Sequence, residues 1–248
     1  MPKIEDLKIK MYCDGADVES LLQMYKNPLI KGFTTNPTLM RKAGVDDYEK
    51  FGRAIVQAIP DRPISLEVFA DELDEMEQQA MVLASFGQNV NVKIPVTNTK
   101  GEPTDRVIRN LSRRGVVLNV TAILTLEQVR RVAAALDPAT PAIVSVFAGR
   151  VADTGVDPVP MMREALKLLK DRPKAELLWA SPRELLNIFH ADQAGCHIIT
   201  VTTDLLAKLA LIGKSLEQFS LETVKMFYND ALAAGYSINV GTAEAVTR

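Results

Sequence analysis

The chain has 248 residues, of which 47% are hydrophobic, and its formal net charge at pH 7 is −2. This length is enough for a substantial core in one barrel-sized domain, and the interspersed charges exclude the basic stripe that nucleic acid requires. No apolar run is long enough to span a bilayer, and the opening residues MPKIEDLKIK lack the apolar core of a signal peptide. We therefore expect a soluble, cytoplasmic protein without nucleic-acid or membrane partners.

Eight short apolar or β-branched segments recur along the chain, and each is followed by a pattern with apolar residues three and four apart, as one buried helix face requires. These segments are IKMYCDG (9–15), KGFTTNP (31–37), ISLEVFA (64–70), VNVKIPV (90–96), GVVLNVTAI (115–123), AIVSVFAG (142–149), AELLWASP (175–182) and CHIITVTTD (196–204). The alternation predicts a closed (β/α)8 TIM barrel over residues 1–214. A doubly wound open sheet is the alternative, but no glycine-rich phosphate loop follows any segment.

A further helical pattern, around residues 216–234, exceeds the number that a barrel uses. We expect residues 215–248 to form a C-terminal helical extension. It would pack either on the outside of the barrel or on a neighbouring subunit.

Polar residues gather where the predicted strands end, which is where a barrel of this kind carries its chemistry. Alternate residues of a strand share a face, so a polar pair two residues apart points the same way. Seven strands show this feature, with Asp14, Asn36, Glu67, Lys93, Asn119 and Thr121, Ser145 and Phe147, and Ser181. A barrel that is only structural would end these strands in apolar residues.

Lys93 stands in the middle of the predicted strand VNVKIPVT, where an unpaired ammonium group would be costly. One interpretation is structural, with the side chain reaching the rim or pairing with Glu67. The other is catalytic, because a partly apolar interior favours the free amine. A free amine attacks a ketone and forms a Schiff base, which permits carbon–carbon bond cleavage.

Other residues near the strand ends suit the same chemistry. Asp14 and Glu67 are carboxylates that can move protons, and the hydroxyl of Thr121 can hold a water molecule. Arg150 and Arg183 follow two strand ends and can bind an anionic head group. Structural alternatives remain, because Asp14 can cap the following helix and Thr121 can support a turn. Residues 34–36 can likewise form a turn before the next helix.

The cysteines and histidines predict no metal site. Cys13 and Cys196 lie far apart without metal-ligand spacing, and we expect reduced thiols, with a disulfide as the alternative. His190 falls on a predicted helix and His197 at the amino end of a strand, away from the catalytic end of a barrel. Neither histidine is an expected catalyst.

Six segments, in order and with compatible spacing between Met11 and Gly213, resemble the transaldolase family, which is related to the fructose-6-phosphate aldolases. They are KGFTTNPTLM (31–40), VNVKIPVT (90–97), LNVTAIL (118–124), SVFAGRVAD (145–153), ASPRE (180–184) and AGCHIIT (194–200). The resemblance implies a class I aldolase-type barrel that transfers a dihydroxyacetone unit between sugar phosphates of the pentose phosphate pathway. It also implies that no metal or organic cofactor takes part.

Carried over residue by residue, the resemblance implies a role for each matching position. Lys93 would be the Schiff-base nucleophile, Asp14 the acid/base of cleavage, and Glu67 the acid/base that positions a water with Thr121. Asn36, Asn119 and Ser145 would hydrogen-bond the dihydroxyacetone portion. Thr34 and Phe147 are further expected substrate-binding residues. Arg150, Ser181 and Arg183 would hold the phosphate.

Two positions separate the branches of this superfamily, since the fructose-6-phosphate aldolases have glutamine at the place of Glu67 and tyrosine at the place of Phe147. Both residues therefore resemble the transaldolase branch. The chain departs from the family at Pro182, where phenylalanine is usual, and at ITVTTDLL (199–206), where proline is usual. These differences leave the head group of the substrate open between phosphate and an acid such as sulfonate.

Three functions follow as hypotheses. The first is a transaldolase acting on ketose and aldose phosphates. The second is an aldolase of the same fold that releases dihydroxyacetone, or a transaldolase for a sulfo-sugar. The third is a non-catalytic sugar-phosphate-binding barrel, which predicts that a proton-transfer residue is missing. The resemblance also implies a homo-oligomer, with a decamer formed through the C-terminal helix as one form.

Overall fold

The computed structural model of the chain describes residues 4–239. The chain contains two compact units. Of the described residues, those up to Leu209 form the larger unit, and the smaller begins at Ala210.

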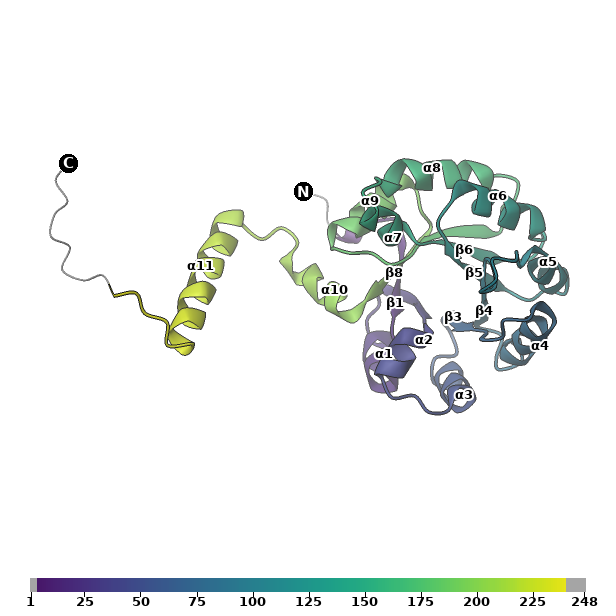
Figure 1. Cartoon of the computed structure of the whole chain (residues 1–248), viewed down its shortest axis with the longest axis horizontal. Helices are drawn as coiled ribbons and strands as arrows, with labels where there is room; N and C mark the ends of the chain where they lie inside the picture. Colours follow the sequence, from purple (N-terminus) through teal and green to yellow (C-terminus); the bar gives the residue numbers. More distant parts are fainter. Residues whose placement is uncertain (1–3, 240–248) are drawn as a thin grey trace. The chain divides into compact units, whose positions relative to one another are not determined.

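The larger unit is a closed barrel in which eight parallel strands pair in chain order and β8 pairs back onto β1. Figure 1 shows the strands surrounded by helices. The strands are β1 (Lys10–Asp14), β2 (Ile30–Thr34), β3 (Ile64–Glu67), β4 (Val90–Pro95), β5 (Leu118–Ile123), β6 (Ala142–Val146), β7 (Ala175–Trp179) and β8 (Ile198–Thr202). The predicted (β/α)8 barrel is confirmed, and all eight predicted segments contain a strand.

Helices follow every strand of the barrel. They are α1 (Val18–Tyr25), α2 (Pro37–Lys42), α3 (Tyr48–Ala58), α4 (Leu73–Ala84), α5 (Asp105–Arg113), α6 (Leu126–Ala135), α7 (Ala148–Asp153), α8 (Pro158–Leu168), α9 (Leu186–Ala194) and α10 (Thr203–Ala207). Short 3-10 helices, η1 (Ile4–Asp6) and η2 (Lys208–Leu211), precede β1 and follow α10.

Side-chain caps fix where several of these helices begin. The carboxylates of Asp17, Asp47 and Asp157 accept backbone N–H groups at the starts of α1, α3 and α8. Thr125 and Gln128 form a capping box at the start of α6. Because these caps satisfy N–H groups that lack a partner in the helix, each of these four helices begins at a defined residue.

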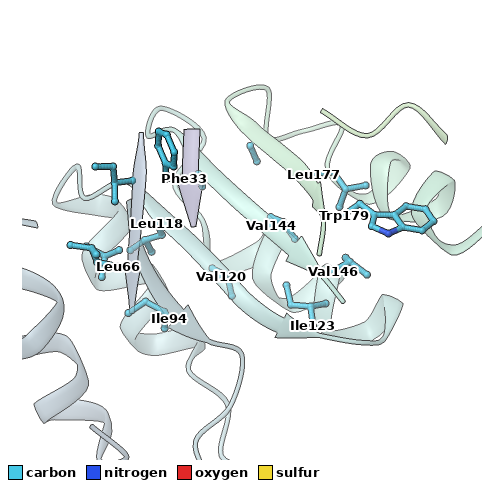
Figure 2. Packing of buried hydrophobic residues seen from close by; sticks show 14 of the residues in the cluster. Phe33, Leu66, Ile94, Leu118, Val120, Ile123, Val144, Val146, Leu177 and Trp179 are labelled. Carbon is cyan, nitrogen blue, oxygen red and sulfur yellow. The ribbon is translucent and has the colours of Figure 1, made fainter. Parts of the chain in front are cut away.

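The outward faces of the strands form the main hydrophobic core against the helices. Figure 2 shows part of this layer, with Leu66, Val120, Val144 and Trp179 packed in one apolar cluster. Each of these side chains is fully buried. This layer holds the helices on the barrel and leaves the inward faces free for other groups.

The inward faces change from apolar to polar toward the carboxyl ends of the strands. A small cluster that includes Tyr12, Ile143, Leu178 and Ile198 fills the barrel floor. At Gly32, a Cβ atom would lie 2.5 Å from the Tyr12 ring, so the glycine makes the room that this ring occupies. Two residues further along three of these strands stand Asp14, Ser145 and Thr200, and the floor therefore supports a polar layer.

The smaller unit contains one long helix, α11 (Leu216–Ala233), which begins at the Ser215 cap. No residue of this helix is buried, and its exposed side chains include Phe219, Val224 and Phe227. The additional C-terminal helix is confirmed, whereas residues 240–248 of the predicted extension lie outside the described residues. Among residues 4–239, no helix is both long enough and apolar enough to cross a membrane.

Candidate active site

A cavity of about 790 Å³ opens at the carboxyl ends of the barrel strands. All twelve residues predicted for the site line it. Arg150 comes from α7, and the others come from seven of the eight strands or from the loops directly after them. The twelve are Asp14, Thr34, Asn36, Glu67, Lys93, Asn119, Thr121, Ser145, Phe147, Arg150, Ser181 and Arg183. The fold thus brings together positions that span most of the sequence.

Lys93 projects from β4 into the deep part of this cavity and is 6% exposed. Its Nζ donates to Glu67 Oε2 at 2.9 Å and to the Thr35 carbonyl oxygen at 2.7 Å. The pairing with Glu67 considered for a structural lysine is therefore present. The surroundings of the ammonium group are more polar than the strand pattern predicts, because strand register sets Glu67 directly beside Lys93.

Glu67 is the last residue of β3, and Tyr48 fixes its backbone. The Tyr48 hydroxyl donates to the Glu67 carbonyl oxygen at 2.9 Å and accepts from the Glu67 N–H at 2.6 Å. Burial raises the pKa of Tyr48 above its ordinary value, so the phenol stays neutral. Tyr48 is absent from the sequence prediction, because nothing local to the start of α3 indicates that it reaches the end of β3.

Asp14 ends β1 and receives one donor on each carboxylate oxygen. Thr34 Oγ1 donates to Oδ1 at 2.8 Å, and Asn36 Nδ2 donates to Oδ2 at 3.2 Å. Burial raises the pKa of Asp14, while the charge of Lys93 and these two hydrogen bonds act in the opposite direction. The capping alternative for Asp14 is wrong, since Asp17 caps α1.

Asn36 both caps a helix and donates a hydrogen bond to Asp14 in the cavity. Its side-chain oxygen caps α2 by accepting the Leu39 N–H at 2.9 Å, as turn chemistry before Pro37 predicts. With the oxygen so engaged, the amide nitrogen faces Asp14. The helix cap therefore orients a donor toward the carboxylate.

A second group of polar side chains crosses the barrel beside Lys93. Asn119 Nδ2 donates to Ser65 Oγ at 3.0 Å, and Ser145 Oγ donates to Asn119 Oδ1 at 2.7 Å. All three side chains are buried. Their mutual hydrogen bonds offset the cost of burying polar groups and fix the rotamers of the cavity wall.

Thr121 and Phe147 complete the wall between β5 and β6. Thr121 is buried and lines the cavity, while Thr125 caps the following helix, so turn support at Thr121 is not needed. Phe147 packs against the floor cluster. Among the described residues, Ala122 and Ser181 are the non-glycine residues with positive φ, at 61° and 60°, and both line this cavity. Such backbone costs energy and is concentrated at functional sites.

The two arginines differ in their partners. Arg150, on α7, stacks over the Phe147 ring at 5.5 Å. Arg183 Nε donates to Asp153 Oδ1 at 3.0 Å and its Nη2 donates to the other oxygen of the same carboxylate. The charge of Arg183 is thus shared with Asp153, which the sequence does not predict.

Close packing holds the Arg183 loop against α7. A Cβ atom at Gly149 would lie 1.6 Å from the Ser181 carbonyl oxygen and 3.3 Å from Arg183 Nε. Only glycine fits at this contact. The glycine of the SVFAGRVAD segment therefore sets the spacing between the two predicted anion-binding loops.

Several cavity residues are missing from the sequence prediction, namely Thr200, Thr202, Asp204, Lys208 and Lys42. Thr200 and Thr202 lie on the inward face of β8, two and four residues after Ile198 of the floor. Strand alternation from Ile198 was the signal that could have identified them. The charged residues lie on helices after the strands, where no periodic signal marks the cavity.

The cysteines and histidines lie apart from this chemistry. Cys13 and Cys196 are free and buried, and burial raises the pKa of each thiol to about 12. His197 Nδ1 accepts the Leu177 N–H at 2.9 Å before β8, and His190 lies on α9. Within residues 4–239, no group of three or more His, Cys, Asp or Glu residues could hold a metal ion.

A (β/α)8 barrel with a buried lysine–carboxylate pair among polar strand ends is the architecture of a barrel enzyme. Residues 11–244 match the family described as Transaldolase/Fructose-6-phosphate aldolase. The chain belongs to this family.

Curated relatives support the assignment. A "Probable transaldolase 2" of Listeria monocytogenes is 35% identical over 215 residues, covering 85% of this chain and 94% of the relative. A "Probable transaldolase" of Caldicellulosiruptor saccharolyticus is 33% identical over 216 residues, covering 85% and 95%. Another, of Dehalococcoides mccartyi, is 32% identical over 202 residues, covering 81% and 90%.

Solved structures agree on the fold. Dihydrodipicolinate synthase of Rhodopseudomonas palustris superposes with a TM-score of 0.55 at 12% identity, covering 94% of this chain and 82% of that one. A 2,3-dimethylmalate lyase superposes with a TM-score of 0.53 at 12% identity, covering 97% and 89%. At this identity, the likeness concerns the fold alone.

Proposed function

We propose that the enzyme is a transaldolase that moves a dihydroxyacetone unit from a ketose phosphate, such as fructose 6-phosphate or sedoheptulose 7-phosphate, to an aldose phosphate. A Schiff base on Lys93 carries the unit between the two sugars. The observation that carries the proposal is the buried Lys93 amine, 2.9 Å from the Glu67 carboxylate within one cavity. The names of the curated relatives support the same activity.

In the first step, the proton of the Lys93 ammonium group passes to Glu67, its hydrogen-bond partner. The free amine attacks the C2 carbonyl of the ketose and forms a carbinolamine. Glu67 then returns a proton to the carbinolamine hydroxyl, which leaves as water and gives the iminium ion. The Thr121 hydroxyl holds this water. Over the whole step, the ammonium group and the ketone become the iminium ion and one water, and Glu67 ends ionised as it began.

In the second step, Asp14 removes the proton from the C4 hydroxyl of the ketose. The C3–C4 bond breaks and its electrons enter the iminium group, which leaves an enamine on Lys93 and releases an aldose phosphate. Asn119 and Ser145 hold the hydroxyl groups of the retained unit. The acceptor aldose then reacts by the reverse sequence. The raised pKa of Asp14 favours its holding the transferred proton.

The rival functions make different demands on the same cavity. A non-catalytic barrel predicts the loss of a proton-transfer residue, whereas Asp14, Glu67, Lys93 and Thr121 all line the cavity. An aldolase would release dihydroxyacetone without an acceptor. That outcome depends on how long the enamine persists, and Phe147 offers no hydroxyl to protonate it.

Turnover of the wild-type enzyme should require an acceptor aldose phosphate. The Phe147→Tyr variant should release free dihydroxyacetone even when no acceptor is present. The new phenol can deliver a proton to the enamine, so we expect roughly a tenfold gain, below the 10²–10⁴-fold of a well-placed acid. Adding Glu67→Gln should enlarge the gain, because the pair then matches the aldolase branch. The assay measures free dihydroxyacetone from fructose 6-phosphate with and without erythrose 4-phosphate.

Phe86→Tyr is the matched control for this experiment, since it adds a phenol hydroxyl at a partly buried position that does not line the cavity. It should leave release without acceptor unchanged. If wild-type protein turns over as fast without acceptor as with it, the enzyme is an aldolase and the transaldolase proposal fails.

Arg150 and Arg183 should act mainly in binding the anionic head group, and unequally. Arg150→Ala should raise KM for a sugar phosphate by about ten- to a hundred-fold, the equivalent of roughly 1.5–3 kcal/mol, and change kcat little. Arg183→Ala should raise KM less, because Asp153 already shares the charge of Arg183. Steady-state kinetics with phosphorylated and unphosphorylated sugars measures both effects.

The matched control is Arg131→Ala, which removes an arginine that also pairs with an aspartate, Asp105, outside this cavity. Its KM should equal that of the wild type. Equal wild-type KM for phosphorylated and unphosphorylated sugars would refute the anion site. A marked preference for a sulfonated sugar would keep the site and change the substrate.

We also propose that the enzyme is cytoplasmic and that it works without a metal or an organic cofactor. The two free, buried cysteines suit a reducing compartment. Lys93 provides the electron sink that a cofactor would otherwise supply.

We further propose that α11 packs on a neighbouring subunit in a homo-oligomer, for which the family resemblance implies a decamer. Leu221, Val224, Tyr228 and Leu232 recur three and four residues apart and form one apolar stripe on this helix. Each is more than half exposed, at 54%, 60%, 64% and 60%. An exposed apolar stripe of this kind marks an interaction surface.

The mass of the particle that the full chain forms in solution, measured by light scattering, should therefore be a whole-number multiple of 27.3 kDa and at least twice that value. Val224→Glu should lower this mass, because it places a charge in the stripe. Asn229→Glu should not, since it adds the same charge at an exposed polar position of the same helix. A monomeric wild-type protein would contradict the proposal.

A further inference from the structure

We propose that Thr200 is a positioning residue whose hydroxyl, acting through Thr34, holds Asp14 as the carboxylate that the reaction needs. The importance of Asp14 for turnover rests on the proposed function. The hydrogen-bond chain itself follows from the geometry of three neighbouring strands.

The chain of hydroxyl groups lies on the inward face of β1 and its two neighbours. In the strand register, Asp14 is paired with Thr34 of β2, and Thr200 of β8 is paired with Tyr12, two residues before Asp14. Thr34 Oγ1 and Thr200 Oγ1 are 2.5 Å apart, so the two side chains meet across β1. Both are buried, at 3% and 7% exposure.

The number of hydroxyl protons sets the direction of this chain. An ionised carboxylate can only accept hydrogen bonds, and each threonine hydroxyl has a single proton to donate. Because Thr34 donates its proton to Asp14 Oδ1, the contact between the threonines requires Thr200 to donate to Thr34. The order is therefore Thr200 to Thr34 to Asp14.

With Thr200 donating to Thr34 and Thr34 donating to Asp14, the hydrogen-bond chain favours the ionised form of Asp14. Successive hydrogen bonds polarise one another, so donation by Thr200 makes Thr34 a stronger donor. The other donor to Asp14 cannot adjust, because Asn36 is held by its helix cap. Of the two hydrogen bonds to Asp14, the one from Thr34 is thus the one whose strength can change.

Charged groups around the cavity act on Asp14 together with this chain. Lys93 favours the carboxylate and Glu67 disfavours it, and burial disfavours it most. The other charged residues that line the cavity are Lys42, Arg150, Arg183, Asp204 and Lys208. A substitution at Thr200 leaves all of these charges in place.

The direct test is the carboxyl titration of Asp14 by NMR, with ¹³C-labelled aspartate and Asp14→Asn to assign the signal. Thr200→Val keeps the branched shape and removes the hydroxyl, and should raise the pKa of Asp14 by roughly half a unit. Thr200→Ser should restore the wild-type value. Thr34→Val should shift the titration further, and adding Thr200→Val to it should change nothing more.

Thr104→Val is the matched control. Thr104 is also buried, but its hydroxyl donates to the Pro95 carbonyl oxygen and it does not line the cavity. Its loss should leave the Asp14 titration where it is. An unchanged or lowered Asp14 pKa in Thr200→Val, or a failure of Thr200→Ser to restore it, would overturn the proposal.

Kinetics supplies a second readout. Since Asp14 must be ionised to accept a proton, the acid limb of the kcat profile should move to higher pH in Thr200→Val, with KM unchanged. The NMR titration needs no turnover. Failure of the transaldolase proposal would therefore appear in the assay for product, and failure of the Thr200 proposal in the titration.

Discussion

The buried ammonium group of Lys93 is the constraint around which the interior of this barrel is arranged. A charge inside the barrel wall needs acceptors within hydrogen-bond reach, and Glu67 and the Thr35 carbonyl oxygen provide them. Removing one partner from such a buried pair typically costs about 3–5 kcal/mol. The neighbouring residues keep Glu67 in place, and Tyr48 does so by bonding both backbone groups of that residue. The proposed proton exchange within the pair therefore needs no movement of the Glu67 backbone.

The floor of the barrel makes this polar interior tolerable. Tyr12 and its apolar neighbours close the barrel below the site, and Gly32 supplies the space for the Tyr12 ring. Above the floor, buried polar groups bond to one another, as Ser145 does to Asn119. Hydrogen bonds of this kind hold the side chains in one rotamer, which favours a preorganised site. The same strand alternation that builds the floor thus supplies the polar layer that lines the cavity.

The eight strands, and the twelve positions that line the cavity, could be predicted because each depends on local pattern: alternation, strand ends and a few short motifs. The contacts between segments that lie far apart in the sequence could not be predicted. The pairing of Arg183 with Asp153 joins a loop to the end of α7, and the bond from Tyr48 to Glu67 joins a helix start to a strand end. The packing of helices and loops on the barrel decides such contacts, and one sequence does not show that packing. Asn36 was ambiguous for a different reason, since one side chain both caps a helix and faces Asp14.

Covalent trapping at Lys93 tests the central claim most directly. Incubation with fructose 6-phosphate and borohydride should reduce the imine, and peptide mass spectrometry should locate a dihydroxyacetone or hexose phosphate adduct on Lys93. Lys93→Met should show no adduct and no turnover, while Lys167→Met, at an exposed lysine that also pairs with a glutamate, should label as the wild type does. An adduct on another lysine, or turnover that survives in Lys93→Met, would contradict the account.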